Sequence, residues 1–427
     1  MCGIVAYLGK KPAQPILIEG LKRLEYRGYD SAGVALLGAG PIRIKKTSGR
    51  ITALEEILDP PNDVETTGIG HTRWATHGAP NTVNAHPHQD YTGKIAVVHN
   101  GIIENYATLR TWLENEGAVF ASETDTEVIV ALIGYFYAKC SEDEENPPHG
   151  GQNKFEWAVQ RALRELHGTF GLAIVCSDCP GMLIGAKKGS PLILGVGDSE
   201  YILASDAAAI VEHTTQAIYL ADNEMVTVTP DGFHTKTIDN VTVSKSLKQI
   251  EFSLEQIELG GFEHHMLKEI FEQPKAIATC MGGRIDLNNK RIKLGGIASY
   301  LRELTRTRRL ILTACGTAFH AGLVGEFLFE HLARIPAETE YASEFRYRNP
   351  IIEYGTVVIA ISQSGETLDT FAAVEEAKER GATVLGVVNV VGSAIARATD
   401  AGIYLHAGPE IGVASTKAFT CQVAVLT

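Results

Sequence analysis

The residue with the most obvious reactive chemistry stands at the second position of the chain. Cys2 precedes an apolar run, residues 4–8, that predicts a buried strand. Removal of Met1 would give Cys2 an α-amine beside its thiol. Because the reference pKa of an α-amine is about 8 and that of a thiol about 8.5, the amine can accept the thiol proton at neutral pH. Cys2 could therefore be an N-terminal nucleophile that carries its own base, although a small buried cysteine is the plainer alternative.

Three polar segments could supply groups that work with such a nucleophile: residues 68–78, 99–101 and 122–127. By residue type alone, Arg73 and Asp125 would most simply form surface ion pairs, which contribute little to stability. Asn100-Gly101 would be a type I′ turn between strands. Ser122 and Asp125 also have capping-box spacing, which predicts that a helix begins beside them. The residue types permit chemistry at these segments but do not by themselves assign it.

Two turns in the second half of the chain have the composition of phosphate-binding loops. Each follows a short apolar strand and leads into a helix: residues 314–317 after strand 310–313, and residues 362–367 after strand 357–361. Backbone N–H groups at a helix N-terminus and Ser or Thr hydroxyls donate to phosphate oxygens. One such turn would be only a helix cap, whereas two at neighbouring strand ends predict a phosphate site.

Composition argues against several other classes of protein. A length of 427 residues predicts two or three domains, and 45% hydrophobic with 21% charged residues is typical of a globular protein. The net charge of −13 argues against nucleic-acid or anionic-membrane partners, and we expect neither a transmembrane helix nor a signal peptide. Seven scattered cysteines predict reduced thiols and a cytoplasmic location. Cys176 and Cys179 lack the second ligand pair that zinc requires, so we expect no metal, and we expect no organic cofactor.

The order of expected elements divides the chain into two parts. Residues 2–235 mix helices with short strands at intervals of about 8–12 residues, which predicts a layered αββα domain. We place a linker at residues 236–284, with a helix at 263–273 that ends before Pro274. From residue 285 to 427, strands and helices alternate, which predicts a doubly wound parallel sheet. The expected fold class is therefore α/β.

Together, these segments resemble the glutamine–fructose-6-phosphate aminotransferase (isomerising) family. The N-terminal part is similar to a class II glutamine amidotransferase (glutaminase) domain, which is Ntn-hydrolase-like, and the C-terminal part is similar to a sugar-isomerase (SIS) domain. The matching motifs are Cys2-Gly3-Ile4-Val5, residues 26–33 (YRGYDSAG), 71–78 (HTRWATHG), His99-Asn100-Gly101, 122–127 (SETDTE), Ala314-Cys315-Gly316-Thr317, 362–367 (SQSGET) and 410–417 (EIGVASTK). Two unrelated domain types in this order make a chance resemblance negligible.

The resemblance implies a transferase that converts fructose 6-phosphate and glutamine to glucosamine 6-phosphate and glutamate, the first step of amino-sugar synthesis. It implies that Cys2 attacks the glutamine side-chain amide and forms a γ-glutamyl thioester with release of ammonia. Asn100 and Gly101 would form the oxyanion hole, where loss of one donor typically costs roughly 2.7–4 kcal/mol of barrier.

The same resemblance implies which residues bind glutamine. Arg73 would bind the substrate carboxylate, because a planar guanidinium can donate two parallel hydrogen bonds to the two carboxylate oxygens. Asp125 would pair with the substrate ammonium group. Trp74 would be a gate for ammonia on its way to the sugar. His77 and His86 also match positions of the glutamine site, where we expect them to position loops rather than to ligate a metal.

For the sugar site, the resemblance implies seven residues near fructose 6-phosphate: Thr317, Ser362, Gln363, Ser364, Thr367, Val413 and Ser415. Ala318 stands where the family usually has serine, so we expect a changed phosphate contact. The family carries a second SIS domain and a lysine-bearing tail, and it is usually homodimeric. Because no cap closes the helix expected at 416–427, we expect a longer parent protein, and we expect this chain alone not to complete the amination.

Two other functions stay open at this point. One is a different amidotransferase, of the phosphoribosyl-transferring or asparagine-forming kind, and the SIS motifs argue against it. The other is a non-enzymatic sugar-phosphate sensor or dimerisation module with an inert glutaminase half. The presence of the whole expected set, Cys2, Arg73, Asn100, Gly101 and Asp125, argues against that alternative.

Overall fold

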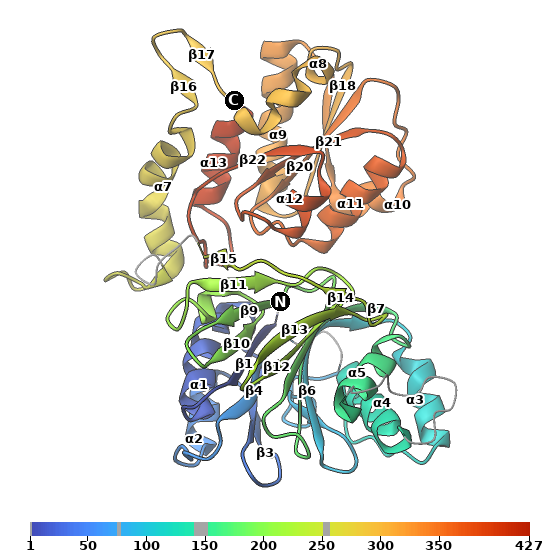
Figure 1. Cartoon of the computed structure of the whole chain (residues 1–427). Coiled ribbons are helices and arrows are strands. Elements are labelled where there is room, and N and C mark those ends of the chain that lie inside the picture. The colour runs from blue at the N-terminus through green and yellow to red at the C-terminus, as the bar shows by residue number, and fades with distance from the viewer. Residues whose placement is uncertain (1, 75–77, 141–152, 251–256) are drawn as a thin grey trace. The chain divides into compact units, whose positions relative to one another are not determined.

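The computed structural model describes residues 2–74, 78–140, 153–250 and 257–427 (Figure 1). The chain forms two compact units, Met1–Leu254 and Glu255–Thr427. Each unit has its own sheets and its own hydrophobic clusters. The two units are therefore described separately.

The larger sheet of the first unit is antiparallel and contains the strand that follows Cys2. Among the described residues it has eight strands, in the order β15-β11-β9-β10-β1-β4-β2-β3. They are β1 (Gly3–Leu8), β2 (Ser31–Leu37), β3 (Arg43–Ser48), β4 (Thr67–Arg73), β9 (Ile193–Val196), β10 (Tyr201–Ala204), β11 (Gln216–Tyr219) and β15 (Lys248–Gln249). Because β1 pairs with both β10 and β4, it is an inner strand of the sheet.

The second sheet of this unit is also antiparallel and has seven strands within the described ranges, in the order β14-β13-β12-β8-β7-β6-β5. They are β5 (His88–Gln89), β6 (Ile95–Ile103), β7 (Gly168–Cys176), β8 (Leu183–Lys188), β12 (Glu224–Thr229), β13 (Gly232–Thr237) and β14 (Thr242–Val243). Strand β13 runs past residue 235, and strands β14 and β15 lie wholly beyond it. The first unit is therefore longer than the domain expected at residues 2–235.

The two sheets pack face to face, and helices cover their outer faces (Figure 1). A buried cluster between the sheets includes Ile4 of β1, Ile69 of β4 and Val98 of β6. Helix α1 (Ala13–Leu24) covers the larger sheet, and helices α4 (Asp125–Lys139) and α5 (Lys154–Leu163) cover the smaller one. The remaining helices of the unit are η1 (Glu25–Arg27), α2 (Ile51–Ile57), α3 (Tyr106–Asn115) and η2 (Ala207–Ala209). The expected αββα layering is confirmed.

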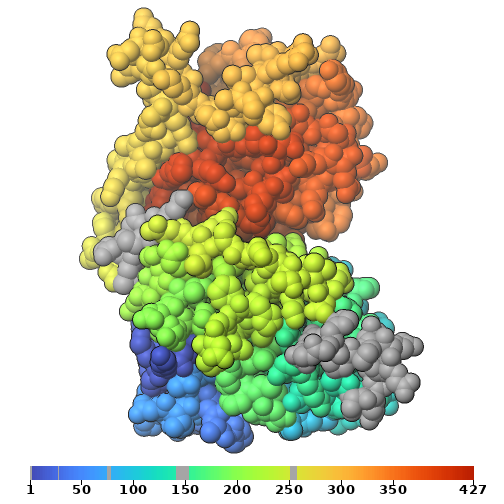
Figure 2. Space-filling view, viewed as in Figure 1, coloured from blue at the N-terminus to red at the C-terminus, as the bar shows by residue number. Residues whose placement is uncertain are grey.

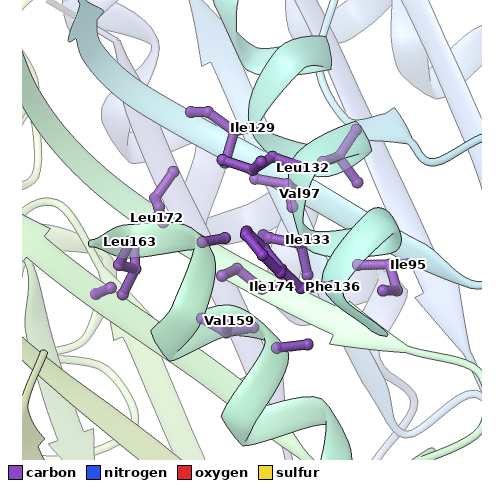
Figure 3. Close-up of a cluster of buried hydrophobic side chains, with 14 of the residues drawn as sticks. Ile95, Val97, Ile129, Leu132, Ile133, Phe136, Val159, Leu163, Leu172 and Ile174 are labelled. Atoms are coloured by element: carbon purple, nitrogen blue, oxygen red, sulfur yellow. The ribbon is translucent and has the colours of Figure 1, made fainter. Parts of the chain in front are cut away.

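A second hydrophobic cluster fills the space between the smaller sheet and its helices (Figure 3). The labelled side chains are Ile95, Val97, Ile129, Leu132, Ile133, Phe136, Val159, Leu163, Leu172 and Ile174. Side chains alternate along a strand, so Ile95 and Val97 face these helices while Ala96 and Val98 face the other sheet. Strand β6 is thus held from both faces just before it reaches Asn100.

The second unit contains a parallel sheet of five strands in its described residues, in the order β19-β18-β20-β21-β22. They are β18 (Arg309–Ala314), β19 (Ala337–Tyr341), β20 (Thr356–Ser362), β21 (Thr383–Val388) and β22 (Ala401–Tyr404). Leu310 and Leu312 enter one hydrophobic cluster and Ile311 enters another, so both faces of the sheet are buried. The expected doubly wound parallel sheet is confirmed.

Helices of the second unit cover both faces of this sheet. They are α7 (His265–Met281), η3 (Gly295–Tyr300), α8 (Leu301–Leu304), α9 (Thr317–Leu328), η4 (Phe329–Ala333), α10 (Ala342–Tyr347), α11 (Leu368–Glu379), α12 (Ala394–Ala398) and α13 (Lys417–Leu426). Among the helices that the structure describes, none combines the length and the hydropathy needed to cross a bilayer.

Helix α7 corrects the prediction of a helix that ends before Pro274. It runs to Met281 with Pro274 inside. A proline cannot donate to the carbonyl four residues earlier, which here belongs to Ile270. The Gln273 side chain donates to that carbonyl instead, at 2.9 Å. Beyond the proline, Ala276 and Cys280 are buried in the core, which favours continuation of the helix.

Between α7 and η3, strands β16 (Ile285–Asp286) and β17 (Arg291–Ile292) form a two-stranded hairpin. The hairpin stands out from the second unit in the ribbon and in the space-filling view (Figure 1, Figure 2). Its tip residue Leu287 is 83% exposed. The hairpin adds little to the core that positions the candidate sites.

Candidate functional site

Every second side chain of strand β4 points toward the second sheet. Ile69 lies in the cluster between the sheets, and alternation gives His71 and Arg73 the same side. Gly68 and Gly70 face helix α1, where a Cβ at either position would stand 2.9 Å from a leucine side chain of that helix. Close packing of α1 therefore requires glycine on one face of β4 and leaves the other face for the polar residues.

Cys2 lies at the start of β1 and is half-buried. The Trp74 backbone N–H donates to Cys2 Sγ at 3.2 Å, and Asn100 Nδ2 donates to the Cys2 carbonyl at 3.0 Å. The Trp74 ring is 42% exposed and packs edge to face against Tyr29, with 5.5 Å between ring centroids. His77 lies outside the described residues. The thiol thus stands where the start of β1, the end of β4 and strand β6 meet.

Asn100 and Gly101 lie within strand β6, not in a hairpin turn. The strand continues to Ile103 and pairs with β7 along its whole length. Gly101 has φ +134°, and a Cβ there would stand 2.2 Å from the Thr169 carbonyl oxygen. The alternative of a type I′ turn is therefore wrong, and the position accepts only glycine.

Arg73 and Asp125 bring opposite charges to this end of the unit from β4 and α4. Both are buried, at 4% and 6% exposure. The Ile103 backbone N–H donates to Asp125 Oδ2 at 2.9 Å. Burial lowers the pKa of the Arg73 guanidinium, while its electrostatic interactions with Cys2 and Asp125 raise it. Surface ion pairing is therefore wrong for both residues, and the Arg73 charge interacts with both Cys2 and Asp125.

The cap of helix α4 differs from the predicted one. Thr124 is the N-cap, and its hydroxyl accepts from the Glu127 N–H at 3.3 Å. The Glu127 carboxylate accepts from the backbone N–H groups of Ala121 and Ser122, at 2.8 and 2.6 Å. The pair that caps the helix is thus Thr124 and Glu127, because the Asp125 carboxylate is turned toward β6 instead. This cap places Asp125 at the first helical position.

Four buried histidines lie close to Asn100. The His71 and His86 ring centroids are 4.3 Å apart, and those of His86 and His88 are 5.1 Å apart. His99 Nδ1 lies 3.0 Å from the hydroxyl of a threonine in α4. Burial lowers the pKa of all four imidazoles, that of His71 to about 3. The expected site residue His86 is therefore a neutral side chain packed inside this cluster.

The seven residues expected at the sugar site surround one cavity of the second unit, with a volume of about 400 Å³. They are Thr317, Ser362, Gln363, Ser364, Thr367, Val413 and Ser415. Cys315 and Ala318 line the same cavity. It lies at the carboxyl ends of β18 and β20, where open parallel sheets bind their ligands. Its volume suits a small molecule.

The turn after β20 is shaped by its own hydroxyl groups. Ser362 Oγ accepts from the Gly365 N–H at 2.9 Å, and Ser364 Oγ accepts from the Glu366 N–H at 3.2 Å. Gly365 has φ +67°, and a Cβ there would stand 1.9 Å from a neighbouring serine hydroxyl. These bonds hold the turn so that the start of helix α11 borders the cavity.

Two glutamates hold the loop that carries Val413 and Ser415. Glu410 accepts from the Ser415 hydroxyl at 2.6 Å. Glu269 of α7 accepts from the backbone N–H groups of residues 411 and 412, at 2.6 and 3.1 Å. Burial raises the pKa of Glu269, although these two amide bonds lower it. One wall of the cavity is therefore attached to helix α7.

Three residues at or beside these sites are absent from the set expected from the sequence. His71 lies in the polar segment 68–78, but residue type alone does not show that it faces Asn100. Cys315 lies in the first phosphate-loop turn, so its position was a usable signal. Glu269 lies in a helix far from the loop in sequence, and the helical pattern carries no sign of that contact.

Known domain families match parts of both units. A glutamine amidotransferase domain matches residues 71–212, and an SIS domain matches residues 303–427. Among solved structures, the C-terminal domain of glucosamine-fructose-6-phosphate aminotransferase from Francisella tularensis is 36% identical, over 40% of this chain and 47% of that chain, with a TM-score of 0.38. The glutamine phosphoribosylpyrophosphate amidotransferase of B. subtilis is 18% identical, over 91% of this chain and 81% of that chain, with a TM-score of 0.46.

Curated relatives match the chain from end to end. The glutamine–fructose-6-phosphate aminotransferase (isomerizing) of Chlorobaculum tepidum is 54% identical over 429 residues, which is 100% of this chain and 68% of that protein. The proteins of the same name from Bacteroides thetaiotaomicron and Mycobacterium tuberculosis are 52% and 45% identical, over 100% and 99% of this chain and 68% of each relative. The chain thus spans about two thirds of their length. It belongs to the glutamine–fructose-6-phosphate aminotransferase (isomerising) family.

Proposed function

We propose that this chain releases ammonia from glutamine at Cys2 and holds fructose 6-phosphate in the cavity of its second unit. The products of the whole reaction are glutamate and glucosamine 6-phosphate. One observation carries the proposal: Cys2, Arg73, Asn100 and Asp125 come from four separate segments, Asn100 donates to the Cys2 backbone, and the Arg73 charge interacts with both Cys2 and Asp125. Membership of the family supports it independently.

The proposed reaction begins with a proton transfer within Cys2. After removal of Met1, the α-amine takes the thiol proton, and Sγ attacks the side-chain carbonyl carbon of glutamine. The C–N bond then breaks, the nitrogen leaves as ammonia with the transferred proton, and a γ-glutamyl thioester remains. Water hydrolyses the thioester to glutamate and restores the thiol. The Trp74 N–H at 3.2 Å favours the thiolate, because a hydrogen-bond donor stabilises the charged form.

The attacked oxygen becomes negatively charged and needs donors aimed at it. We assign this role to Asn100 Nδ2, which already points toward the Cys2 backbone at 3.0 Å, and to the backbone N–H of Gly101. A donor held in place before the reaction stabilises the developing charge without having to reorient. The absence of a Cβ at Gly101 lets the strand approach β7 closely here.

Glutamine recognition requires one cation and one anion near the nucleophile, because the substrate is a zwitterion. Arg73 suits the carboxylate, since a guanidinium can donate two parallel hydrogen bonds. Asp125 suits the ammonium group, and the Ile103 N–H holds its carboxylate in place by donating to Oδ2. We propose that Trp74, half-exposed beside the thiol, gates the departure of ammonia.

The sugar phosphate is proposed to bind at the two strand-to-helix turns of the second unit. Helices α9 and α11 begin at this cavity, and helix N-termini favour anions. Hydroxyls of Thr317, Ser364 and Thr367 supply further donors to phosphate oxygens.

Ala318 contributes no hydroxyl, so Ala318→Ser is expected to tighten fructose 6-phosphate binding by roughly 3- to 10-fold through one added hydrogen bond.

The first experiment measures glutamate release from glutamine by the purified chain, with removal of Met1 verified by intact mass. The parent is expected to release glutamate and Cys2→Ala to release none above background. Cys179→Ser is the matched control, because it removes another partly exposed thiol of the same unit. Glutamate release by Cys2→Ala at the parent rate would show that Cys2 is not the nucleophile.

The sugar assignment is tested separately, by the shift in thermal midpoint with fructose 6-phosphate and with fructose. A shift that requires the phosphate and is lost in Ser364→Ala supports the proposed cavity. A shift with a phosphoribosyl pyrophosphate but none with fructose 6-phosphate would favour the other class of amidotransferase.

We also propose a homodimer and a cytoplasmic location. Helix α9 presents Leu323, Val324 and Phe327 at 43%, 38% and 66% exposure, and burial of such a face favours association. Sedimentation velocity is expected to give twice the mass of the chain, and a monomer at every concentration would contradict the dimer. Cell fractionation tests the location.

A further inference from the structure

Two oxygen atoms face the Nε2 atom of His71. One is Asn100 Oδ1, at 2.9 Å, and the other is the His99 carbonyl oxygen, at 3.0 Å. Neither oxygen can donate in an amide, so Nε2 must carry the proton and donate to both. His71 belongs to β4 and both acceptors belong to β6. This donor therefore joins the two sheets at the end that holds Cys2.

The surroundings of His71 keep it neutral and select one tautomer. Its side chain is fully buried, and burial, aided by His99 and Arg73, lowers its pKa to about 3. Its Nδ1 atom has no hydrogen-bond partner among the described residues, and the ring lies against His86. A proton on Nδ1 would be a buried donor without an acceptor, which costs about 1–3 kcal/mol. The neutral form with the proton on Nε2 is thus the one that the packing favours.

This donor decides which way the Asn100 amide points. A side-chain amide can rotate by a half-turn, which exchanges its oxygen and nitrogen. In the observed orientation, Oδ1 accepts from His71 and Nδ2 donates to the Cys2 carbonyl. The reversed orientation would set the amide N–H groups against the His71 N–H, and the amide oxygen against the Cys2 carbonyl oxygen. Two repulsive contacts would then replace two hydrogen bonds.

We propose that His71 is a positioning residue of the glutaminase site, whose Nε2–H holds the Asn100 amide so that its nitrogen donates toward the oxyanion at Cys2. The inference rests on the oxyanion role proposed above for Asn100. His71 contacts neither the nucleophile nor the space beside it in the contacts described, so it acts through Asn100. Its contribution is the orientation of a donor before charge develops, which is where oxyanion stabilisation gains its strength.

Two polar substitutions test the proposal. His71→Gln carries an amide N–H at about the place of Nε2, whereas His71→Asn matches the place of Nδ1 and leaves no donor toward Asn100. Loss of one oxyanion donor costs about 10²–10³ in kcat. We therefore expect His71→Asn to lower kcat for glutamine hydrolysis roughly 10- to 100-fold with KM near that of the parent, and His71→Gln to retain most activity.

His88→Asn is the matched control for loss of a buried imidazole. His88 belongs to the same histidine cluster but its Nε2 bonds the Thr124 hydroxyl, at 3.1 Å. We expect this variant to unfold more easily than the parent but to keep kcat within about twofold. A fall in kcat as large as that of His71→Asn would mean that the cluster acts only through general stability, and would overturn the proposal.

A double-mutant cycle separates orientation of Asn100 from any other effect. In an Asn100→Ala background there is no amide to orient, so adding His71→Asn should cost less than about twofold in kcat. The same fall in both backgrounds would overturn the proposal, as would an unchanged kcat for His71→Asn alone. Absence of glutaminase activity in the parent would instead overturn the proposed function.

A measurement on the parent does not depend on whether a variant folds. Nitrogen-15 NMR of histidine-labelled protein distinguishes the two neutral tautomers, and His71→Gln assigns the signal. We expect the signal of a neutral ring with the proton on Nε2, unchanged between pH 8 and pH 6. A proton on Nδ1, or titration near pH 6.5, would contradict the proposed donor.

Discussion

Gly101 shows at the residue scale how little freedom the proposed glutaminase site has. Its φ of +134° and the Thr169 carbonyl oxygen at 2.2 Å from an added Cβ both oppose a side chain. Gly101→Ala is expected to lower the free energy of unfolding of the first unit by about 2–4 kcal/mol, through backbone strain and steric overlap. Glutamine hydrolysis should fall with it.

Tryptophan fluorescence in urea measures this loss, because Trp74, Trp112 and Trp157 all lie in the first unit. Gly117→Ala is the matched control. Gly117 also has a positive φ, +95°, but nothing lies within 4 Å of an added Cβ. Its substitution should cost only about 1 kcal/mol. Equal losses in the two variants would show that the contact with Thr169 is unimportant.

Cys179 is a second residue with a testable chemical property. Hydrogen bonds from Cys176 and from Asn153 lower the pKa of the Cys179 thiol to about 6, against the effect of burial. Since thiolates react with alkylating agents, Cys179 should be alkylated by iodoacetamide at pH 7 and much more slowly at pH 5. Peptide mapping by mass spectrometry measures this. Cys176→Ala removes one donor and should slow the reaction at pH 7, whereas an unchanged rate would contradict the stated cause.

At the scale of elements, helix α7 depends on a side chain that replaces a backbone donor. Gln273 bonds the Ile270 carbonyl, which Pro274 leaves without its usual partner. Gln273→Ala should therefore weaken the middle of α7 and speed amide exchange in the residues around the proline, by roughly 3- to 10-fold, which corresponds to about 1 kcal/mol. Hydrogen–deuterium exchange with mass spectrometry measures the rate in this segment.

Pro274→Ala is the background that tests the cause. With alanine at this position, a backbone N–H reaches the Ile270 carbonyl and the Gln273 side chain becomes redundant. Gln273→Ala should then leave the exchange rate unchanged. An equal acceleration in both backgrounds would show that Gln273 stabilises α7 by another route.

Elements with a regular pattern could be predicted from the sequence, and those shaped by distant contacts could not. The apolar strands before residues 314 and 362 and the turns after them lie as expected, because strand, turn and helix signals there are local. Strand β19 was not expected, since Ala337–Tyr341 is a mixed-polarity edge strand without an apolar run. The extension of α7 past Pro274 depends on one side-chain bond that propensity does not encode.

At the scale of the whole molecule, the histidine cluster makes the first unit sensitive to acid. Burial lowers the pKa of His71, His86, His88 and His99 in the folded state. An unfolded histidine titrates near 6.5, so below that pH the unfolded state binds more protons and stability falls. Each of these histidines should shift the folding equilibrium roughly tenfold toward the unfolded state for each pH unit below 6.5.

Urea unfolding followed by tryptophan fluorescence at pH 7.5, 6.5 and 5.5 checks this dependence. The midpoint should be nearly constant above pH 6.5 and should fall below it. His86→Phe should flatten the fall, and the exposed His167→Gln should leave it unchanged. A midpoint that rises on acidification would contradict the neutral cluster.

Residues of the candidate sites, like the elements, fall into those that the sequence could predict and those that depend on distant contacts. The proposed nucleophile, the charged pair and the proposed phosphate loops have residue types and positions that the sequence shows, and resemblance to a family suggests their roles. His71 and Glu269 act through contacts between segments that are far apart in sequence, His71 with Asn100 and Glu269 with residues 411 and 412. Such contacts are decided by packing, which a single sequence does not reveal.

Because Glu269 links the cavity loop to helix α7, binding of a ligand in the cavity and ordering of the helix should each favour the other. Any ligand that prefers the loop in its held position must, by thermodynamic linkage, also favour the Glu269 contact and the ordered form of α7. Fructose 6-phosphate should therefore slow amide exchange in α7, although the helix does not line the cavity. By the same linkage, Glu269→Gln should weaken sugar-phosphate binding by the factor by which it reduces that protection. Helix α7 would thus report whether the proposed sugar site is filled.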